Sequence, residues 1–407
     1  MSYNYNTTFR RCSDVQFTKG NKLSRRSYPD DGHESHCLRY IRSLYKMRTA
    51  KFFHRCIHDI RLLLVYRQYS HRRLLTLLLV CVLLWIFYKG VHHIFHEEAL
   101  SNPKVDHWCD SEELPSYLLK QDPEEITIVT AYFNLGTYRS GSGYWDYASS
   151  HQIKQRMRPL GKIANPVVAY IEDDSVAEYF LKIRSCFPPS LTRVIKLNRE
   201  DLWSFRLQSH IEVIYGQSSY PKHYPNTVSA EYTCASHAKY ELLESASKEN
   251  FFKTPFFAWL DINYFKNLDE TSFEIFKLIP PGTFNVEMIS MSQAWPHDPN
   301  IPVKEVIENN LVWVSGAMIL GVQETVLNLT LNYRQTVEKL LKKELSASDE
   351  QIIYIMFSAP LRKHVKLHLK TFLCHDGQLD LFGRDARFLC LGYVCRNAWN
   401  KIHKPSL

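Results

Sequence analysis

The feature that most constrains this chain is an uninterrupted apolar run at residues 74–87, which reads LLTLLLVCVLLWIF and follows two arginines. Extended to residue 95, the segment has 22 residues. At ~1.5 Å of rise per residue, a helix of that length spans about 33 Å, close to the thickness of a bilayer's hydrocarbon core. A cleaved signal peptide begins within the first ~15–30 residues, and a buried core helix needs a polar face or a surrounding domain. We therefore expect residues 74–95 to be a transmembrane signal anchor.

Charge is distributed unevenly on the two sides of this segment. Residues 1–73 carry 16 Lys and Arg against 5 Asp and Glu, whereas residues 96–407 carry 33 against 37. The positive-inside rule predicts a cytoplasmic tail at residues 1–73 and a lumenal or extracellular C-terminal part. The basic excess belongs to the tail, so the sequence pI of 8.8 does not indicate a nucleic-acid partner.

The six cysteines that follow the expected anchor are an even number in an oxidising compartment: Cys109, Cys186, Cys234, Cys374, Cys390 and Cys395. Up to three disulfides are compatible with that count. A zinc site is the weaker interpretation because the last three cysteines lack CxxC pairs. Asn328-Leu-Thr330 is a glycosylation sequon on the same side of the membrane.

Short β-rich runs alternate with helical ones beyond a polar stem at residues 96–124. The strand-like runs are 126–133, 166–173, 192–197, 254–263 and 311–322, and the helical ones are 175–187, 229–250, 324–345 and 346–360. Strand and helix alternation of this kind predicts an α/β domain at residues 125–407, with a mostly parallel sheet flanked by helices.

A polar element follows the fourth strand, where PFFAWL ends at Asp261 and Asn263 comes two positions later. Ligands of open α/β sheets bind at the carboxyl ends of strands, which makes Asp261 a site candidate. The unit FFAWLDIN resembles the Asp-x-Asp element of GT-A type glycosyltransferases, in which a divalent cation neutralises a diphosphate leaving group. The acidic run at residues 172–174 (EDD) is the competing metal motif, and it ranks lower because GT-A chains place that motif after several βα units.

The order of several motifs is more specific than any one of them. ITIVTAYFNLG, VVAYIED, a helix bearing Lys239, FFAWLD, SGAMILG and SDEQIIY follow one another over about residues 125–360. This arrangement resembles the HtrL/YibB family, which is grouped with glycosyltransferases. The resemblance implies a GT-A-like, Rossmann-like fold.

Residue by residue, the resemblance implies a nucleotide-sugar site. Lys239 would approach the phosphates, although a solvated helix charge is an equal alternative. Gly316 and Gly321 would let the backbone approach the donor sugar, unless they mark a strand kink. The nucleotide would be lined by the end of the first strand, at Thr130, Ala131 and Tyr132.

Metal and catalytic positions follow from the same resemblance. Asp261 would bind the metal, expected to be Mn²⁺, or the ribose, with Asn263 as a weaker ligand. His375 would be a late imidazole ligand, against the commoner structural role of a lone histidine. Asp349 and Glu350 would face the acceptor as general base or orienting group, unless they only satisfy a helix N-terminus.

The sequence thus predicts a single-pass type II Golgi or ER membrane glycosyltransferase with a lumenal catalytic domain. It would transfer a sugar from a nucleotide-sugar donor to a glycan, glycoprotein or glycolipid acceptor. One alternative is a membrane-tethered binding protein that keeps the fold without catalysis, of which Asn263 would be a symptom. Another is a cell-surface adhesion or receptor ectodomain, against which the βα alternation counts.

Overall fold

The computed structural model describes residues 118, 123–140, 147–268, 274–375 and 385–403. The chain divides into two compact units, Met1–Asn102 and Pro103–Leu407, and the described residues belong to the second. The tail and anchor expected at residues 1–73 and 74–95, and nearly all of the expected stem, lie outside them. Within the described part, no helix has the length and apolar character needed to cross a membrane.

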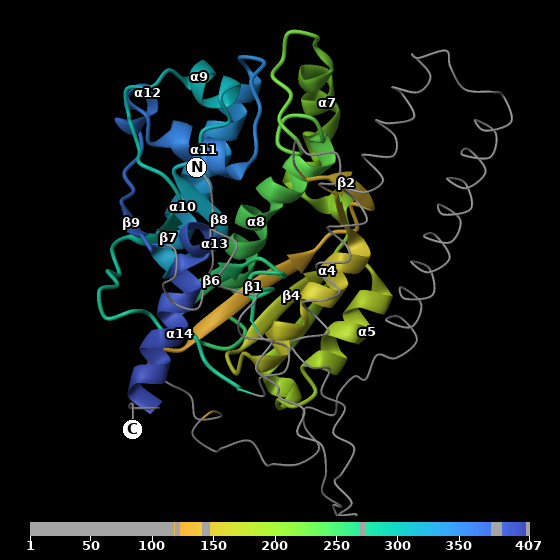
Figure 1. The fold of residues 1–407 in the computed structure, drawn as a ribbon, viewed down its shortest axis with the longest axis vertical. Coiled ribbons are helices and arrows are strands. Elements are labelled where there is room, and N and C mark those ends of the chain that lie inside the picture. Colours follow the sequence, from red (N-terminus) through yellow and green to blue (C-terminus); the bar gives the residue numbers. More distant parts are fainter. Residues whose placement is uncertain (1–117, 119–122, 141–146, 269–273, 376–384, 404–407) are drawn as a thin grey trace, which may run out of the picture. The chain divides into compact units, whose positions relative to one another are not determined.

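A seven-stranded sheet forms the centre of the domain (Figure 1), with strand order β5-β4-β1-β6-β8-β7-β9. Only β8 is antiparallel to its neighbours β6 and β7; the other adjacent pairs are parallel. The expected α/β fold with a mostly parallel sheet flanked by helices is confirmed. The strands are β1 (Ile126–Tyr132), β4 (Val167–Ile171), β5 (Thr192–Lys196), β6 (Phe256–Leu260), β7 (Ile289–Gln293), β8 (Val314–Val322) and β9 (Leu369–Phe372).

Helices cover both faces of this sheet (Figure 1). Alternate β1 residues contribute to two separate hydrophobic clusters, with Val129 in one and Ile128 in the other. Because both faces of β1 are buried, its sequence is almost continuously apolar. Residues of α6 (Trp203–Arg206), α7 (Gln208–Gly216), α8 (Ala230–Glu249), α9 (Val303–Glu308), α10 (Gln323–Leu341) and α11 (Asp349–Met356) pack in the first cluster, and those of α4 (Ser150–Arg156), α5 (Asp174–Ile183) and α14 (Cys390–His403) in the second.

Shorter elements complete the domain. They are the antiparallel hairpin β2 (Thr137–Arg139) and β3 (Tyr147–Ser149), the helices α12 (Ala359–Arg362) and α13 (Asp385–Phe388), and the 3₁₀ turns η2 (Arg158–Lys162), η3 (Pro189–Leu191) and η4 (Arg199–Asp201).

Helix α8 has a capping residue at each end. The Ser229 side chain accepts a hydrogen bond from the N–H of Tyr232, and Asn250 ends the helix in the left-handed conformation at φ 39°. Both are common helix caps, since serine satisfies a free N–H group and asparagine tolerates positive φ. The helix therefore begins and ends at defined residues, which fixes the position of Lys239 along it.

The structure forms some of the up to three disulfides that the cysteine count allows. Cys374 and Cys390 form a disulfide between the end of β9 and the start of α14, with Cα atoms 5.5 Å apart. Cys186 is also disulfide-bonded. Cys234 and Cys395 are free and buried, so the six cysteines do not all pair.

Gly321 and the sequon at residues 328–330 both lie in packed parts of the domain. A side chain at Gly321 would meet Ile289 and Thr325 at 2.6 and 2.7 Å, so this glycine serves close packing of β8 rather than approach to a ligand. In the sequon, the Asn328 amide donates to the Lys366 carbonyl at 3.3 Å and Thr330 is buried. The sequon therefore lies within α10, where Asn328 bonds a neighbouring segment and Thr330 packs in the interior.

Candidate functional site

Charged side chains from three elements meet at the carboxyl edge of the sheet. Asp261 directly follows β6, Lys239 lies within α8, and Asp349 is the first residue of α11. The Lys239 Nζ atom lies 3.4 Å from Asp261 Oδ1 and 3.1 Å from Asp349 Oδ2. The side chains of Lys239, Asp261 and Asp349 are 14%, 30% and 6% exposed. One largely buried ammonium group therefore joins two carboxylates.

An irregularity in β8 shapes this edge. Met291 and Ser292 are consecutive in β7, yet they pair with Ile319 and Ser315 of β8. The β8 residues between these two partners, Gly316 among them, bulge out of the β7 ladder. The Asp261 N–H donates to the carbonyl of one of them, Ala317, at 2.9 Å. Bulges of this kind commonly redirect the chain beside functional sites.

Gly316 makes room for the Asp349 carboxylate. A Cβ atom built at position 316 would lie 1.9 Å from Asp349 Oδ2 and 3.4 Å from Lys239 Nζ. Lys239 Nζ also lies 3.4 Å from the Gly316 carbonyl oxygen, to which it donates. The absence of a side chain at this position is therefore a condition for the carboxylate–lysine contact.

The pKa of each charged group reflects burial and its neighbours. Burial alone would lower the pKa of Lys239, but attraction from Asp261 and then Asp349 outweighs it, so the pKa is raised and the lysine stays charged. The pKa of Asp261 is raised, chiefly by burial, against the opposing effects of Lys239 and of the Trp259 indole. That indole N–H donates to Asp261 Oδ1 at 2.8 Å.

Glu350 directly follows Asp349 in α11, and its pKa is raised to near neutrality. Burial, reinforced by repulsion from Asp349, raises the pKa of Glu350 to about 8, although Lys239 and the N–H of Gly316 oppose the shift. Lys239 thus acts on three carboxyl groups, those of Asp261, Asp349 and Glu350. A carboxyl group with a pKa near neutrality exchanges protons readily at physiological pH.

An aromatic pair lies next to the charged residues. The rings of Tyr138 in β2 and Tyr232 in α8 have centroids 5.4 Å apart. Burial, then the charge of Asp261, raises the pKa of Tyr138, and burial raises that of Tyr232. Both phenols are therefore neutral at physiological pH. Neither tyrosine, nor Trp259, is among the predicted site residues, although a strand places Trp259 on the same face as Asp261.

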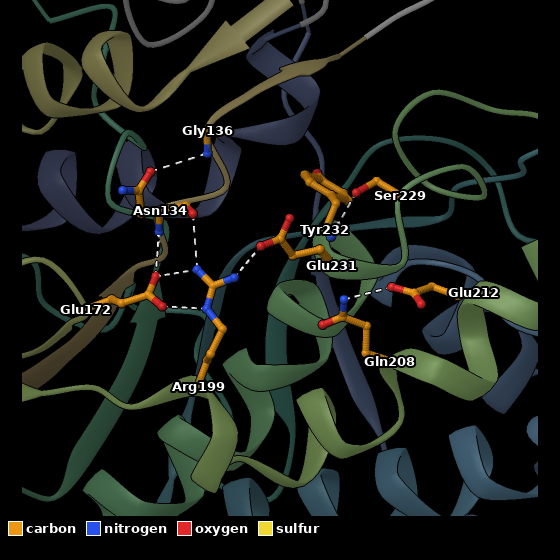
Figure 2. Close-up of polar contacts among 9 residues, drawn as sticks. All are labelled: Asn134, Gly136, Glu172, Arg199, Gln208, Glu212, Ser229, Glu231 and Tyr232. Atoms are coloured by element: carbon orange, nitrogen blue, oxygen red, sulfur yellow. Dashed lines mark hydrogen bonds and ion pairs between the residues drawn. The ribbon is translucent and has the colours of Figure 1, made fainter.

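Arg199 connects the neighbouring strand ends, as Figure 2 shows. Its guanidinium forms ion pairs with Glu172, which follows β4, and with Glu231 in the first turn of α8. It also donates to the Asn134 carbonyl at 3.1 Å, and the Asn134 N–H donates to Glu172 at 2.8 Å. Arg199 thus connects the segments after β1, β4 and β5 to the start of α8. Its partner there, Glu231, directly precedes Tyr232 of the aromatic pair.

The competing acidic run at residues 172–174 is thereby accounted for. Glu172 pairs with Arg199, Asp173 caps α5 by accepting from the N–H groups of Ser175 and Val176, and Asp174 pairs with Lys196. Each of the three carboxylates thus has a structural partner, and they do not act together as one site.

The residues expected to line a nucleotide occupy the end of β1. Thr130, Ala131 and Tyr132 are 0%, 8% and 3% exposed. Ala131 and Tyr132 belong to the two hydrophobic clusters, and the Thr130 hydroxyl is buried without a hydrogen-bond partner. Side chains become exposed only from Asn134 onward, so the polar surface at this strand end begins later than expected.

The expected metal ligands lie in two places. Asn263 is half-buried in the turn directly after Asp261, whereas His375 is exposed in the segment after β9. Both contacts that the structure describes for the Asp261 carboxylate involve Oδ1, which leaves Oδ2 for a further ligand. Within the described ranges, no group of three or more His, Cys, Asp or Glu side chains could hold a metal ion. Asp261 and Asn263 are the two expected ligands that lie close together in the chain.

A sequence profile described as "Bacterial protein of unknown function (HtrL_YibB)" matches residues 124–368. The match covers more than half of the chain. The chain belongs to the HtrL/YibB family. A search of curated proteins gives no match.

The part shared with the HtrL/YibB family contains the whole charged group. Lys239, Asp261, Gly316, Asp349 and Glu350 all lie inside residues 124–368. The segment from His375 onward, with α13 and α14, follows the matched region.

A separate groove of about 750 Å³ is lined by residues 282–286, Met288 and residues 369–371. It runs beside the start of β7 and along β9, and none of its lining residues belongs to the charged group. The groove is mostly open and has no titratable side chain besides Lys370, so the polar edge is the better candidate site.

Proposed function

We propose that this protein is a glycosyltransferase that moves a sugar from a nucleotide-sugar donor to an acceptor hydroxyl. The supporting observation is Lys239, held between Asp261 and Asp349 at the carboxyl edge of a mostly parallel sheet. Ligands of such sheets bind at that edge. A GT-A-like arrangement accords with this sheet and with an acidic residue directly after a central strand.

Lys239 provides a fixed positive charge for the donor. A nucleotide-sugar carries a diphosphate, and its charge grows as the bond to the anomeric carbon breaks. The ammonium of Lys239 contacts Asp261 at 3.4 Å and Asp349 at 3.1 Å, so it is already oriented before substrate binds. Preorganised charge of this kind stabilises a leaving group without a reorganisation cost at the moment of reaction.

A divalent cation, expected to be Mn²⁺, would be held by Asp261 and Asn263 together with the diphosphate. When bound, it supplies additional positive charge to the leaving group. Cations of this type commonly use one or two protein ligands and complete their shell with substrate phosphates and water. That coordination is compatible with two protein ligands and with the unengaged Oδ2 atom of Asp261.

Of the two acidic residues in α11, Glu350 fits the role of general base better. Asp349 is buried and paired with Lys239, so its role is to position the lysine. The carboxylate of Glu350, with its raised pKa, would accept the acceptor's hydroxyl proton. The acceptor oxygen then bonds to the anomeric carbon as the carbon–oxygen bond to the diphosphate breaks, and the nucleoside diphosphate leaves.

The expected membrane anchor indicates where in the cell this domain works. The anchor expected at residues 74–95 and the charge difference around it favour a type II protein of the Golgi or ER with this domain in the lumen. Its acceptor there would be a glycan, a glycoprotein or a glycolipid. Nucleic acid is not expected as a partner.

The test uses the purified full-length chain. We expect a nucleoside diphosphate to raise its melting temperature in the presence of Mn²⁺, because ligands that bind only the native state stabilise it, and a nucleotide sugar to be consumed. Asp261→Asn should abolish both effects, while Asp174→Asn, which alters an aspartate with an 82% exposed side chain, should leave both intact. No response to any nucleotide would favour a binding protein without catalysis.

A further inference from the structure

An exposed tryptophan follows β7 at the same edge of the sheet as the charged group. This residue, Trp295, is 42% exposed. Both Ala294 and Trp295 donate their backbone N–H groups to the Trp313 carbonyl, at 2.8 and 3.1 Å. The backbone of Trp295 is therefore fixed to the chain that enters β8, while much of its side chain faces solvent.

A guanidinium group and an apolar side chain accompany the tryptophan. The Arg387 guanidinium carbon lies 4.5 Å from the centre of a Trp295 ring. Leu373, 50% exposed, directly follows β9, whose last residue pairs with Ser292 of β7. The Cys374–Cys390 disulfide joins the segments that carry Leu373 and Arg387. We call Trp295, Leu373 and Arg387 the tryptophan patch.

The strand register connects the tryptophan patch to the charged group. Gln293, two residues before Trp295, pairs with Val314, two residues before Gly316 in the same edge of the sheet. Gly316 in turn contacts Lys239 and leaves room for Asp349. Trp295 therefore follows the strand adjacent to the one that carries Gly316, at the same edge of the sheet, so a ligand that extends from the charged group across β8 toward β7 would approach the tryptophan patch.

A single exposed apolar residue is ordinary, but exposed apolar side chains grouped beside a polar one commonly mark a binding site, and tryptophan and arginine are enriched where binding energy is concentrated. One face of a pyranose ring consists of C–H groups and packs against an indole, while its hydroxyls need hydrogen-bond partners. Trp295 offers the apolar surface, and Arg387 offers up to five N–H donors. A nucleotide's phosphates, by contrast, are expected at Lys239.

We propose that the tryptophan patch is the acceptor subsite and that the acceptor is a saccharide whose ring packs on the exposed part of the Trp295 indole, beside the Arg387 guanidinium. This inference rests on the proposed glycosyltransferase function. It identifies the acceptor as a sugar rather than a protein side chain or a lipid, since a serine or threonine hydroxyl would need no aromatic surface of this kind.

The experiment measures donor and acceptor binding separately on the full-length chain. Binding of uridine, guanosine and adenosine diphosphates is followed by thermal shift. Binding of the methyl β-glycosides of glucose, galactose and N-acetylglucosamine is followed by saturation-transfer NMR in the presence of the nucleotide that binds. The variants are Trp295→Ala, Trp295→Phe and Arg387→Met, with Leu181→Ala as the control for an exposed apolar residue, 50% exposed on α5.

We expect Trp295→Ala to weaken binding of the preferred glycoside by at least ~10-fold and Trp295→Phe by less than ~3-fold, because a phenyl ring retains most of the stacking. Arg387→Met should weaken glycoside binding, Leu181→Ala should not, and nucleotide binding should be unchanged in all four variants.

Three results would overturn the inference: glycoside binding unaffected by Trp295→Ala, nucleotide binding lost in Trp295→Ala, or a change of oligomeric state in that variant. Nucleotide binding to the wild type without binding of any glycoside would also reject the subsite, while leaving the proposed function standing. Failure of the wild type to bind any nucleotide would instead count against the proposed function.

Discussion

The carboxylate of Asp349 occupies the space that a side chain of residue 316 would fill. A Cβ atom at Gly316 would lie 1.9 Å from Asp349 Oδ2, and this oxygen is the one that Lys239 contacts at 3.1 Å. The glycine, the aspartate and the lysine therefore form one arrangement, in which a change at any position disturbs the other two.

Gly316→Ala should displace the Asp349 carboxylate and weaken its contact with Lys239. We expect a loss of about 1–3 kcal/mol in the free energy of unfolding, because overpacking a buried site costs that much, together with loss of nucleotide binding. Chemical denaturation and thermal shift measure the two effects. Gly216→Ala is the control, since a Cβ there meets nothing within 4 Å. Equal stability of the two variants would contradict this account.

Lys239→Met should leave Asp261 and Asp349 close together without their shared cation. We expect a loss of about 3–5 kcal/mol of stability near pH 7, the cost of removing one partner of a buried pair. Without the opposing effect of Lys239, burial and repulsion from Asp349 would raise the pKa of Asp261 further, so the folded state would bind more protons than the unfolded one. Stability of the variant should therefore fall as pH rises.

Urea denaturation between about pH 4 and pH 8 tests this expectation. Lys248→Met on the same helix is the control, because Lys248 has a 57% exposed side chain and its pair should contribute little. Adding Asp349→Asn to Lys239→Met should restore part of the stability. Loss of equal size in the double and single variants would argue against repulsion as the cause.

The strands nearest the site were predictable because burial on both faces leaves a continuous apolar run. ITIVTAY and FFAWL are such runs, and the polar residue that ends the second is Asp261. Helix α8 could also be placed, since Ser229 is a strong N-cap residue. With these elements located, Lys239 and Asp261 could be expected at the same edge of the sheet.

Strand β7, the register shift beside it and the ion pairs of Arg199 were not predicted. They depend on contacts between distant segments, which leave no local pattern in the sequence. β7 reads ISMSQ, with buried serines that interrupt its apolar character. The register shift that leaves Gly316 out of the ladder arises between β7 and β8, and Arg199 meets Glu172 and Glu231 only after folding. Such pairings are set by tertiary structure, so periodicity alone does not predict them.

Glu350→Gln should raise stability at high pH while sharply reducing transfer. The pKa of Glu350 is raised from 4.5 to about 8, so the folded state holds this proton where the unfolded state has lost it. Stability of the wild type should therefore fall as pH rises through that window. Glutamine does not ionise, so the variant should melt ~2–4 °C above the wild type near pH 9 and equal it near pH 4.

The same substitution tests the role of Glu350 in transfer, which should fall by at least ~100-fold. Nucleotide binding should persist, because Lys239 and Asp261 remain. Glu324→Gln, in the first turn of α10, is the control for losing an acidic residue at a helix start. Transfer that survives Glu350→Gln would remove Glu350 from the role of general base.

Arg199→Lys should loosen the segment after β1 while leaving the core intact. The guanidinium binds Glu172 and Glu231 and also donates to the Asn134 carbonyl at 3.1 Å, and an ammonium cannot reproduce this planar set of donors. Partial burial opposes ionisation of Glu172, but its bonds to Arg199 and the Asn134 N–H dominate and lower its pKa. We therefore expect faster hydrogen exchange of the Asn134 amide and weaker nucleotide binding, by ~5–30-fold for a loss of 1–2 kcal/mol.

Arg206→Lys, which alters an exposed arginine with one backbone contact, should change neither measurement. Unchanged exchange at Asn134 in Arg199→Lys would show that Glu172 holds this segment without the arginine.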